Sequence, residues 1–303
     1  MVDDARVTRS LANLRVDAVT AESVGALGAA GVRTIVLKGP AVARWLYDEP
    51  GERAYRDSDL LVAPRDLRRA QRTLRALGFE PSREESWLRR ARAWSRAGAV
   101  VDLHTSLFGV DVPAASVWAN LSRDTERMEV GGRHVEILGE PARALHVAIH
   151  AAQHPFHDRS HEDLERAAAR VPKATWEGAA RLAAELHADA AMRAGLMRAS
   201  GGDALAQALG LTAPPSAVVG LLAAKAPAPA LGYAQIAAAD STRLRLALVL
   251  RAIAPRPSVM RQPPTLAQRG PLGLAAAYVS RWIRLARSAP ADLRAWRRAR
   301  RSA

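Results

Sequence analysis

The stretch from residue 53 to residue 62, Arg-Ala-Tyr-Arg-Asp-Ser-Asp-Leu-Leu-Val, places two carboxylates at the start of an apolar run. The three apolar residues that end it favour a β-strand, so Asp57 and Asp59, two positions apart, point to the same face. Like charges this close repel each other unless a cation lies between them, and hard divalent cations such as Mg²⁺ take oxygen ligands. The stretch therefore predicts a cation site at the start of this strand.

Two other segments add polar groups that fit such a site. Asp102 follows a short apolar run and is placed to complete the set from a neighbouring strand. Lys38 and Gly39 end another apolar run, and Pro40 suits the first turn of a helix, where free N–H groups and the helix dipole favour an anion. Three carboxylates around one or two metals, beside a glycine turn, are typical of metal-assisted phosphoryl or nucleotidyl transfer.

The motifs together resemble the bacterial nucleotidyltransferase-like family of the DNA polymerase β superfamily. The segments that carry the resemblance are Leu37-Lys38-Gly39, Leu46-Tyr47, the stretch 53–62, Val101-Asp102-Leu103-His104, and Leu-His-x-x-x-His-Ala at 145–151. The resemblance runs from about residue 16 to about residue 165. One departure is Gly39-Pro40 in place of the superfamily's Gly-Ser, because proline removes both a hydroxyl and a backbone donor.

The resemblance implies a role for each matching residue. Asp57, Asp59 and Asp102 would be the metal ligands and catalytic carboxylates, with Asp102 also helping to deprotonate the acceptor. The nucleotide-binding residues would be Lys38, Gly39, Arg53, His104 and His150. The cofactor would be Mg²⁺ or Mn²⁺, and an NTP would donate its NMP group to a hydroxyl or phosphate acceptor that is a small molecule, a peptide or a protein.

Two other functions fit the same residues. The domain is also interpretable as a catalytically idle binding module for a partner protein or peptide, which the Gly39-Pro40 departure favours mildly. A phosphotransferase would use the same metal chemistry. The presence of all three carboxylates favours the enzyme. Substituting Asp57 or Asp59 by Asn is then expected to abolish turnover with little loss of stability, or even with a gain if repulsion is relieved.

Histidines at 146, 150 and 154 fall on one face of a predicted helix, with His157 and His161 following. A zinc site is disfavoured, because no Glu follows the first His as in a zincin and Pro155 interrupts the spacing. We expect His150 to pack against the catalytic domain through a hydrogen-bonded ring nitrogen.

The predicted fold class is α+β: a short mixed sheet with flanking helices in a nucleotidyltransferase domain at 1–140, then an α-helical domain at 141–255 and a basic tail at 256–303. Expected helices cover 17–30, 40–47, 64–77, 86–90, 141–154 and 274–287. Expected strands cover 32–37, 57–62, 91–96, 99–107, 126–130 and 134–138, with another at Phe79. The segment 154–253 reads as helices broken at glycine and proline clusters.

Composition sets few further limits. The chain has no Cys, which excludes disulfides and thiolate metal sites, and no apolar run approaches the ~18 residues of a membrane span. We expect a cytoplasmic protein. Residues 261–303 hold ten Arg and one Asp out of a net charge of +14. This tail is either a solvated arm or a contact for a polyanion, such as nucleic acid, an anionic membrane surface or an acidic peptide, and we expect it to be dispensable for chemistry.

Overall fold

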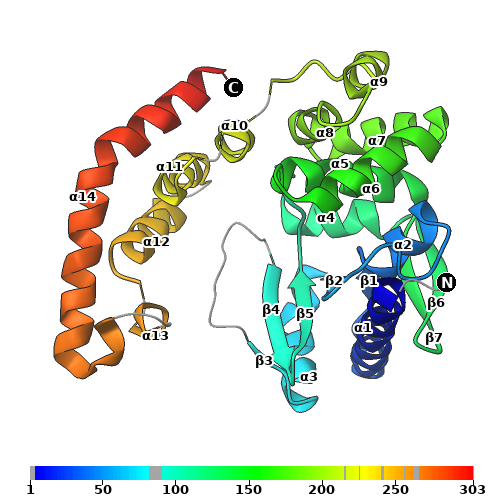
Figure 1. Ribbon diagram of the computed structural model, residues 1–303, viewed down its shortest axis with the longest axis horizontal. Helices are drawn as coiled ribbons and strands as arrows, with labels where there is room; N and C mark the ends of the chain where they lie inside the picture. The colour runs from blue at the N-terminus through cyan, green and yellow to red at the C-terminus, as the bar shows by residue number, and fades with distance from the viewer. Residues whose placement is uncertain are drawn as a thin grey trace. The chain divides into compact units, whose positions relative to one another are not determined.

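The computed structural model of the chain describes residues 4–81, 91–214, 216–224, 226–239, 242–255, 257–261 and 266–302. Its contacts divide the chain into two compact units, Met1–Ala213 and Pro214–Ala303. The first unit combines a sheet with helices, and the described part of the second is helical (Figure 1). The α+β class predicted from the sequence is therefore confirmed.

A seven-stranded mixed sheet with the order β3-β4-β5-β2-β1-β7-β6 forms the centre of the first unit. Strand β2 pairs in parallel with β5 and antiparallel with β1, so the residues after β1 lie beside those that open β2. The strands are β1 (Thr34–Val36), β2 (Ser58–Val62), β3 (Glu80–Pro81), β4 (Ala91–Arg96), β5 (Ala99–His104), β6 (Thr125–Val130) and β7 (Arg133–Leu138).

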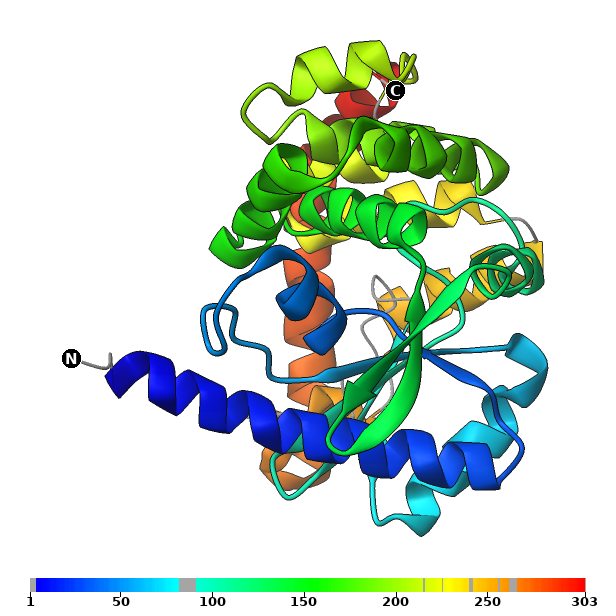
Figure 2. The ribbon, with the colours of Figure 1, turned by 90° about the vertical axis from the view of Figure 1, so that its right-hand side faces the viewer.

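One face of this sheet packs against α1 (Asp4–Ala29) and α3 (Leu67–Ala76), with the short 3-10 helix η1 (Pro64–Asp66) leading into α3 (Figure 2). The buried core there joins Leu27 of α1 and Leu74 of α3 to apolar side chains of the central strands, such as Leu60 and Leu103. Because side chains alternate along a strand, Asp59 and Asp102 point to the opposite face.

Helices gather on the opposite side of the strands in Figure 2. They are α5 (Glu140–Gln153), α6 (Asp158–Arg170), α7 (Lys173–Glu185) and α8 (Asp189–Leu196), and the unit also holds α2 (Pro40–Leu46), α4 (Ala114–Leu121) and α9 (Gly202–Ala208). Helix α5 packs against both α7 and α8. At the α5–α8 contact a Cβ on Gly195 would lie 1.9 Å from the Ala148 carbonyl oxygen, so only glycine allows this approach.

The second unit consists of α10 (Ala217–Ala223), α11 (Ala228–Ala238), α12 (Thr242–Ile253), α13 (Pro257–Met260), the 3-10 helix η2 (Leu266–Gln268) and α14 (Gly270–Ser302). Helix α14 packs against α10, α11 and η2. Residues 214–303 contain fifteen Lys and Arg against two Asp, so this unit carries +13 of the net charge of +14. Across the described residues, no helix combines the length and the apolar character that a bilayer crossing requires.

Most predicted elements are present, with differences at their ends. The strand at 91–96 and the hairpin around Gly131 and Gly132 are confirmed, and the predicted helix at 86–90 lies outside the described residues. The first helix begins at Asp4 rather than at residue 17, α4 was not predicted, and α14 covers Gly270–Ser302 rather than 274–287. By packing, all helices up to Ala213 belong with the sheet, and the predicted three-part division at 140 and 255 stays a prediction.

Candidate active site

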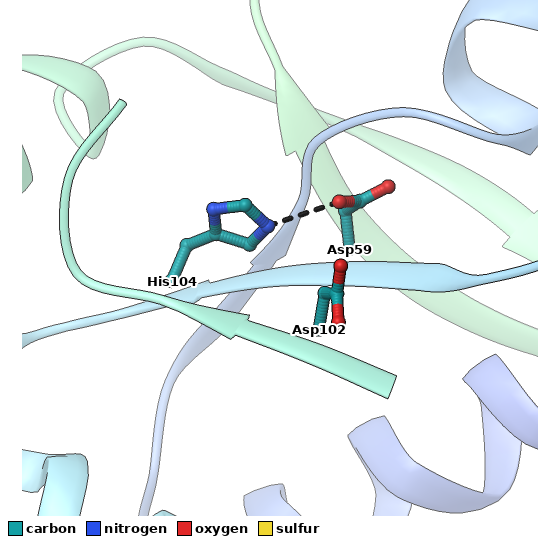
Figure 3. Close-up of side chains that lie close together, drawn as sticks. All are labelled: Asp59, Asp102 and His104. Atoms are coloured by element: carbon teal, nitrogen blue, oxygen red, sulfur yellow. Dashed lines mark hydrogen bonds and ion pairs between the residues drawn. The ribbon is translucent and has the colours of Figure 1, made fainter. Parts of the chain in front are cut away.

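Asp59 and Asp102 are direct partners across the parallel pair β2–β5, so their carboxylates leave neighbouring strands side by side. His104 lies two residues further along β5 and shares their face. Ligand atoms of these three residues all lie within 4.8 Å of one another (Figure 3). The two aspartates are almost fully buried, at 2% and 5% exposure.

Two side chains contact the same oxygen of the buried Asp59 carboxylate. Lys38 Nζ lies 3.2 Å and His104 Nε2 lies 2.9 Å from Asp59 Oδ1. Burial by itself would raise the pKa of Asp59, but the Lys38 charge and the His104 hydrogen bond outweigh it and hold this pKa below its ordinary value. Asp59 is therefore ionised at neutral pH, as a metal ligand has to be.

Lys38 is held in place by the turn between β1 and α2. Gly39 has φ 62° and ψ −115°, a conformation that L side chains rarely adopt, and a Cβ there would meet the Tyr55 ring at 3.4 Å. This turn directs Lys38 Nζ to a position 3.4 Å from His150 Nε2 as well as beside Asp59. Glycine is thus required here for backbone geometry, whatever its part in binding phosphate.

Arg53, for which the sequence predicted a phosphate contact, is buried and already bonded to protein groups. Its guanidinium donates two hydrogen bonds of 2.7 Å to the Asp163 carboxylate on α6, and a third of 3.3 Å to the Gly39 carbonyl. Tyr47 donates to the same carboxylate at 2.8 Å. Arg53 therefore joins α6 to the Lys38–Gly39 turn, and its predicted phosphate contact stays a prediction.

The histidines of α5 form a row along one helix face, as the spacing predicted. Ring centroids of His146 and His150 are 6.3 Å apart, and those of His150 and His154 are 4.7 Å apart. Burial, followed by the nearby charge of Lys38, lowers the pKa of His146 to about 3 and that of His150 well below its ordinary value. His150 Nδ1 lies 3.2 Å from Ser160 Oγ, so this neutral ring packs with both nitrogens close to polar partners.

One cavity of about 280 Å³ contains all eight residues proposed from the sequence. Asp57, which precedes β2, lines this cavity but is outside the group of Asp59, Asp102 and His104. Sequence reasoning assigned no role to several other lining residues, among them Tyr55, Gln153, Arg159 and Ser160. Ser106, inside the predicted strand 99–107, also lines the cavity but lies beyond the end of β5. Nothing in the sequence separates Arg159 from the other arginines.

The donor set fits a hard divalent cation. Two ionisable carboxylates from neighbouring strands supply oxygen ligands, and a histidine supplies a third donor. Asp59 Oδ2 is buried and accepts no hydrogen bond from any described residue, which leaves it available as a ligand. Mg²⁺ or Mn²⁺ suits this oxygen-rich set. The α5 histidines do not belong to it, and among the described residues no other group of three could hold a metal.

Family comparison agrees with this geometry. The profile of the family described as "Uncharacterised nucleotidyltransferase" matches residues 3–200 of the 303-residue chain, a span that includes the sheet and the whole cavity. The chain belongs to this nucleotidyltransferase family. The resemblance read from the Asp-x-Asp and Leu-Lys-Gly segments is thereby confirmed at the level of the family.

Two solved structures show a more distant similarity to this chain. The solution structure of the antibiotic-resistance factor ANT(2'')-Ia matches with 14% identity and a TM-score of 0.39, covering 55% of this chain and 90% of that one. An antigenic nucleotidyltransferase-like protein from Paracoccidioides brasiliensis matches with 14% identity and a TM-score of 0.35, covering 58% of this chain and 93% of that one. No curated protein matches the sequence.

Proposed function

We propose that this protein is a divalent-metal-dependent enzyme that transfers the NMP group of an NTP to a hydroxyl or phosphate acceptor. The observation that carries the proposal is the register pair of Asp59 and Asp102, buried side by side within reach of Lys38 and a third donor, His104. Such a pair is what a metal-assisted transfer needs in order to hold a cation against a phosphate. Family membership supports the same class of reaction.

Each residue has a task in this proposal. Asp59 and Asp102 would hold Mg²⁺ or Mn²⁺, with Asp57 contributing from the start of β2. The bound metal would neutralise charge on the phosphate oxygens and align the nucleophile with the leaving group. Asp102 would also accept the proton of the attacking hydroxyl. Lys38 would exchange its contact with Asp59 for one with a phosphate oxygen, since its amine is a mobile point charge.

A binding module remains the second candidate, because Asp59 already pairs with Lys38 and is hydrogen-bonded to His104 without any metal. In that case the charged side chains of the cavity would only stabilise one another, and the molecule bound by the domain would be a protein or peptide. Phosphoryl transfer differs from the main proposal only in which phosphate bond is cleaved. For either enzyme we infer a cytoplasmic location, where NTPs are available.

The test is a thermal-shift titration with each of the four NTPs, with and without Mg²⁺ or Mn²⁺, on the wild type and on Asp59→Asn. We expect one or more NTPs to raise Tm only when the metal is present, because a ligand that binds the folded state stabilises it by mass action. The gain should vanish in Asp59→Asn. The control is Asp111→Asn, which removes an exposed carboxylate outside the cavity and should keep the full shift.

A second measurement separates enzyme from binding module. Released pyrophosphate indicates nucleotidyl transfer or hydrolysis, and released phosphate or a phosphorylated acceptor indicates phosphoryl transfer. A Tm shift that ignores the metal, or that survives Asp59→Asn unchanged, would contradict the proposed site. The absence of any shift with all four NTPs would favour the binding module.

A further inference from the structure

We propose that Arg159 binds the phosphate groups of the nucleotide, a role that rests on the proposed function. Arg159 stands in the first turn of α6 and lines the cavity of Asp59, Asp102 and Lys38. Its side chain is partly buried, yet it makes no hydrogen bond or ion pair with any residue in the described part of the chain. The cavity therefore contains a guanidinium with unused donors.

Neighbouring arginines show what a satisfied guanidinium looks like in this unit. On α6, Arg166 pairs with Glu162 at 3.3 Å, and Arg170 pairs with Asp48 at 2.6 Å. Arg53, inside the same cavity, is bound by Asp163. All three belong to protein ion pairs, whereas Arg159, which lines the cavity, does not.

The electrostatic surroundings of Arg159 favour an anionic ligand. Burial, and then the positive charge of Arg53, lower the pKa of Arg159, and the attraction of Asp163 and Asp57 does not outweigh them. Holding a guanidinium partly out of water beside a second one costs free energy unless an anion joins them. A phosphate group meets this need, because two of its oxygens match the guanidinium fork and form charge-assisted hydrogen bonds.

The position of Arg159 suits a ligand with several phosphates. A second cavity of about 420 Å³ shares Arg53, His157 and Arg159 with the cavity of the aspartates. Arg159 thus lies where the two cavities adjoin. Lys38, which contacts Asp59, lines only the cavity of the aspartates. A triphosphate chain that contacts the metal site and Lys38 at one end would contact Arg159 further along. We expect a monophosphate held at the metal site to depend less on Arg159, since it has no further phosphate groups to place beside it.

The test compares Arg159→Gln with Arg166→Gln, a matched substitution on the same helix whose side chain lines neither cavity. Calorimetric titration of the full-length protein uses Mg²⁺ with ATP, ADP or AMP, and separately inorganic tripolyphosphate. If the nucleotide preferred in the thermal-shift screen is another one, its tri-, di- and monophosphates replace the adenosine series. We expect Arg159→Gln to weaken NTP binding at least tenfold, to weaken tripolyphosphate binding too, and to leave NMP binding unchanged.

Folding is checked by Tm, which should change little in Arg159→Gln because no hydrogen bond or ion pair with a described residue is lost. Arg159→Lys keeps the charge without the fork and should recover part of the affinity. Equal NTP affinity in Arg159→Gln, Arg166→Gln and the wild type overturns the inference while the proposed function stands. If the wild type binds no NTP but binds tripolyphosphate through Arg159, the proposed function fails and the phosphate site is kept; if tripolyphosphate binding also ignores Arg159, both fail.

Discussion

Asp163 on α6 receives two hydrogen bonds of 2.7 Å from the Arg53 guanidinium, and both side chains are about 95% buried. This pair joins α6 to the loop that precedes β2. Arg53 also donates a hydrogen bond to the Gly39 carbonyl, in the turn that holds Lys38. The pair therefore holds in place the turn that carries Lys38. Its partners come from segments 110 residues apart.

We predict that Asp163→Asn lowers the free energy of unfolding by about 3–5 kcal/mol, because removing one partner leaves Arg53 buried without a counter-charge. Glu136→Gln is the control. It breaks the Arg33–Glu136 pair, which has side chains 46% and 31% exposed, and such a pair contributes about 1 kcal/mol or less. Urea denaturation followed by circular dichroism measures both. Equal losses in the two variants would contradict the structural role of the buried pair.

Glycines at positions 28 and 39 should respond in opposite directions to substitution by alanine. Gly39→Ala forces a side chain into a positive-φ conformation against Tyr55 and should cost about 1–3 kcal/mol. Gly28 lies within α1 and has no atom of the described residues within 4 Å of its Cβ position, so Gly28→Ala should gain up to about 1 kcal/mol. The same denaturation experiment tests both. Loss of stability in Gly28→Ala would contradict the prediction for this position.

Sequence reasoning could select residues that line one cavity because their signals are local. Asp57 and Asp59 are separated by one residue, Lys38 adjoins a glycine that needs positive φ, and Asp102 follows an apolar run. Strand periodicity then sets which side chains share a face, and the parallel register of β2 and β5 brings Asp59 beside Asp102. The prediction of the sheet and its faces rested on these short-range rules.

The parts that the sequence left open depend on contacts between distant segments. Nothing in the order of residues indicates that Asp163 takes the guanidinium of Arg53, or that Lys38 compensates Asp59. Among 41 arginines, the lack of a partner for Arg159 is visible only once the fold places the others. Helix α4 was not predicted because its only polar residues are Ser116 and Asn120, too few to mark a polar face at helical spacing.

Knowledge of the Lys38 contact changes the expected stability of the aspartate variants. From the sequence, like-charge repulsion made a gain in stability conceivable for either Asn substitution. Because Asp59 Oδ1 accepts contacts from Lys38 and His104, we now predict that Asp59→Asn destabilises the metal-free protein by about 1–3 kcal/mol. Chemical denaturation in EDTA measures the change. A gain in stability would show that repulsion from the other carboxylates dominates at this position.

Acid should destabilise the protein through His150, which is held neutral by burial and by the charges that face it. The charged groups that face it are Lys38 after β1 and Arg53 before β2. His146 and His154 lie beside it on its own helix, and the Ser160 hydroxyl of α6 lies against its other nitrogen. The folded-state pKa is depressed, so the unfolded chain takes up a proton near pH 6.5 that the folded state does not. The contribution of His150 to the free energy of unfolding is therefore fully present above about pH 6.5. Below that pH it falls by at most about 1.4 kcal/mol per pH unit.

The variant His150→Gln should reduce that slope between about pH 6.5 and pH 5. His134→Gln is the control, since it removes an exposed histidine on β7 and should leave the slope as in the wild type. The measurement is the free energy of unfolding from urea titrations at half-unit pH steps. Identical slopes in His150→Gln and the wild type would show that His150 is free to protonate in the folded protein.

The basic second unit should bind polyanions in a salt-dependent way that is independent of the nucleotide site. Residues 214–303 carry a net +13, and the last helix ends in a cluster of arginines at 297, 298, 300 and 301. Each phosphate contact releases counterions, so log K for a single-stranded oligonucleotide should fall with log[salt] with a slope of about −0.7 per contact. Replacing the four arginines by Gln should make this slope shallower while the metal-dependent NTP shift stays at its wild-type value. Fluorescence anisotropy from 50 to 300 mM salt, roughly the range in which such contacts are screened, measures the slope. A loss of the NTP shift in a still-folded variant would contradict the prediction that the tail is dispensable, and would assign these arginines to the nucleotide site.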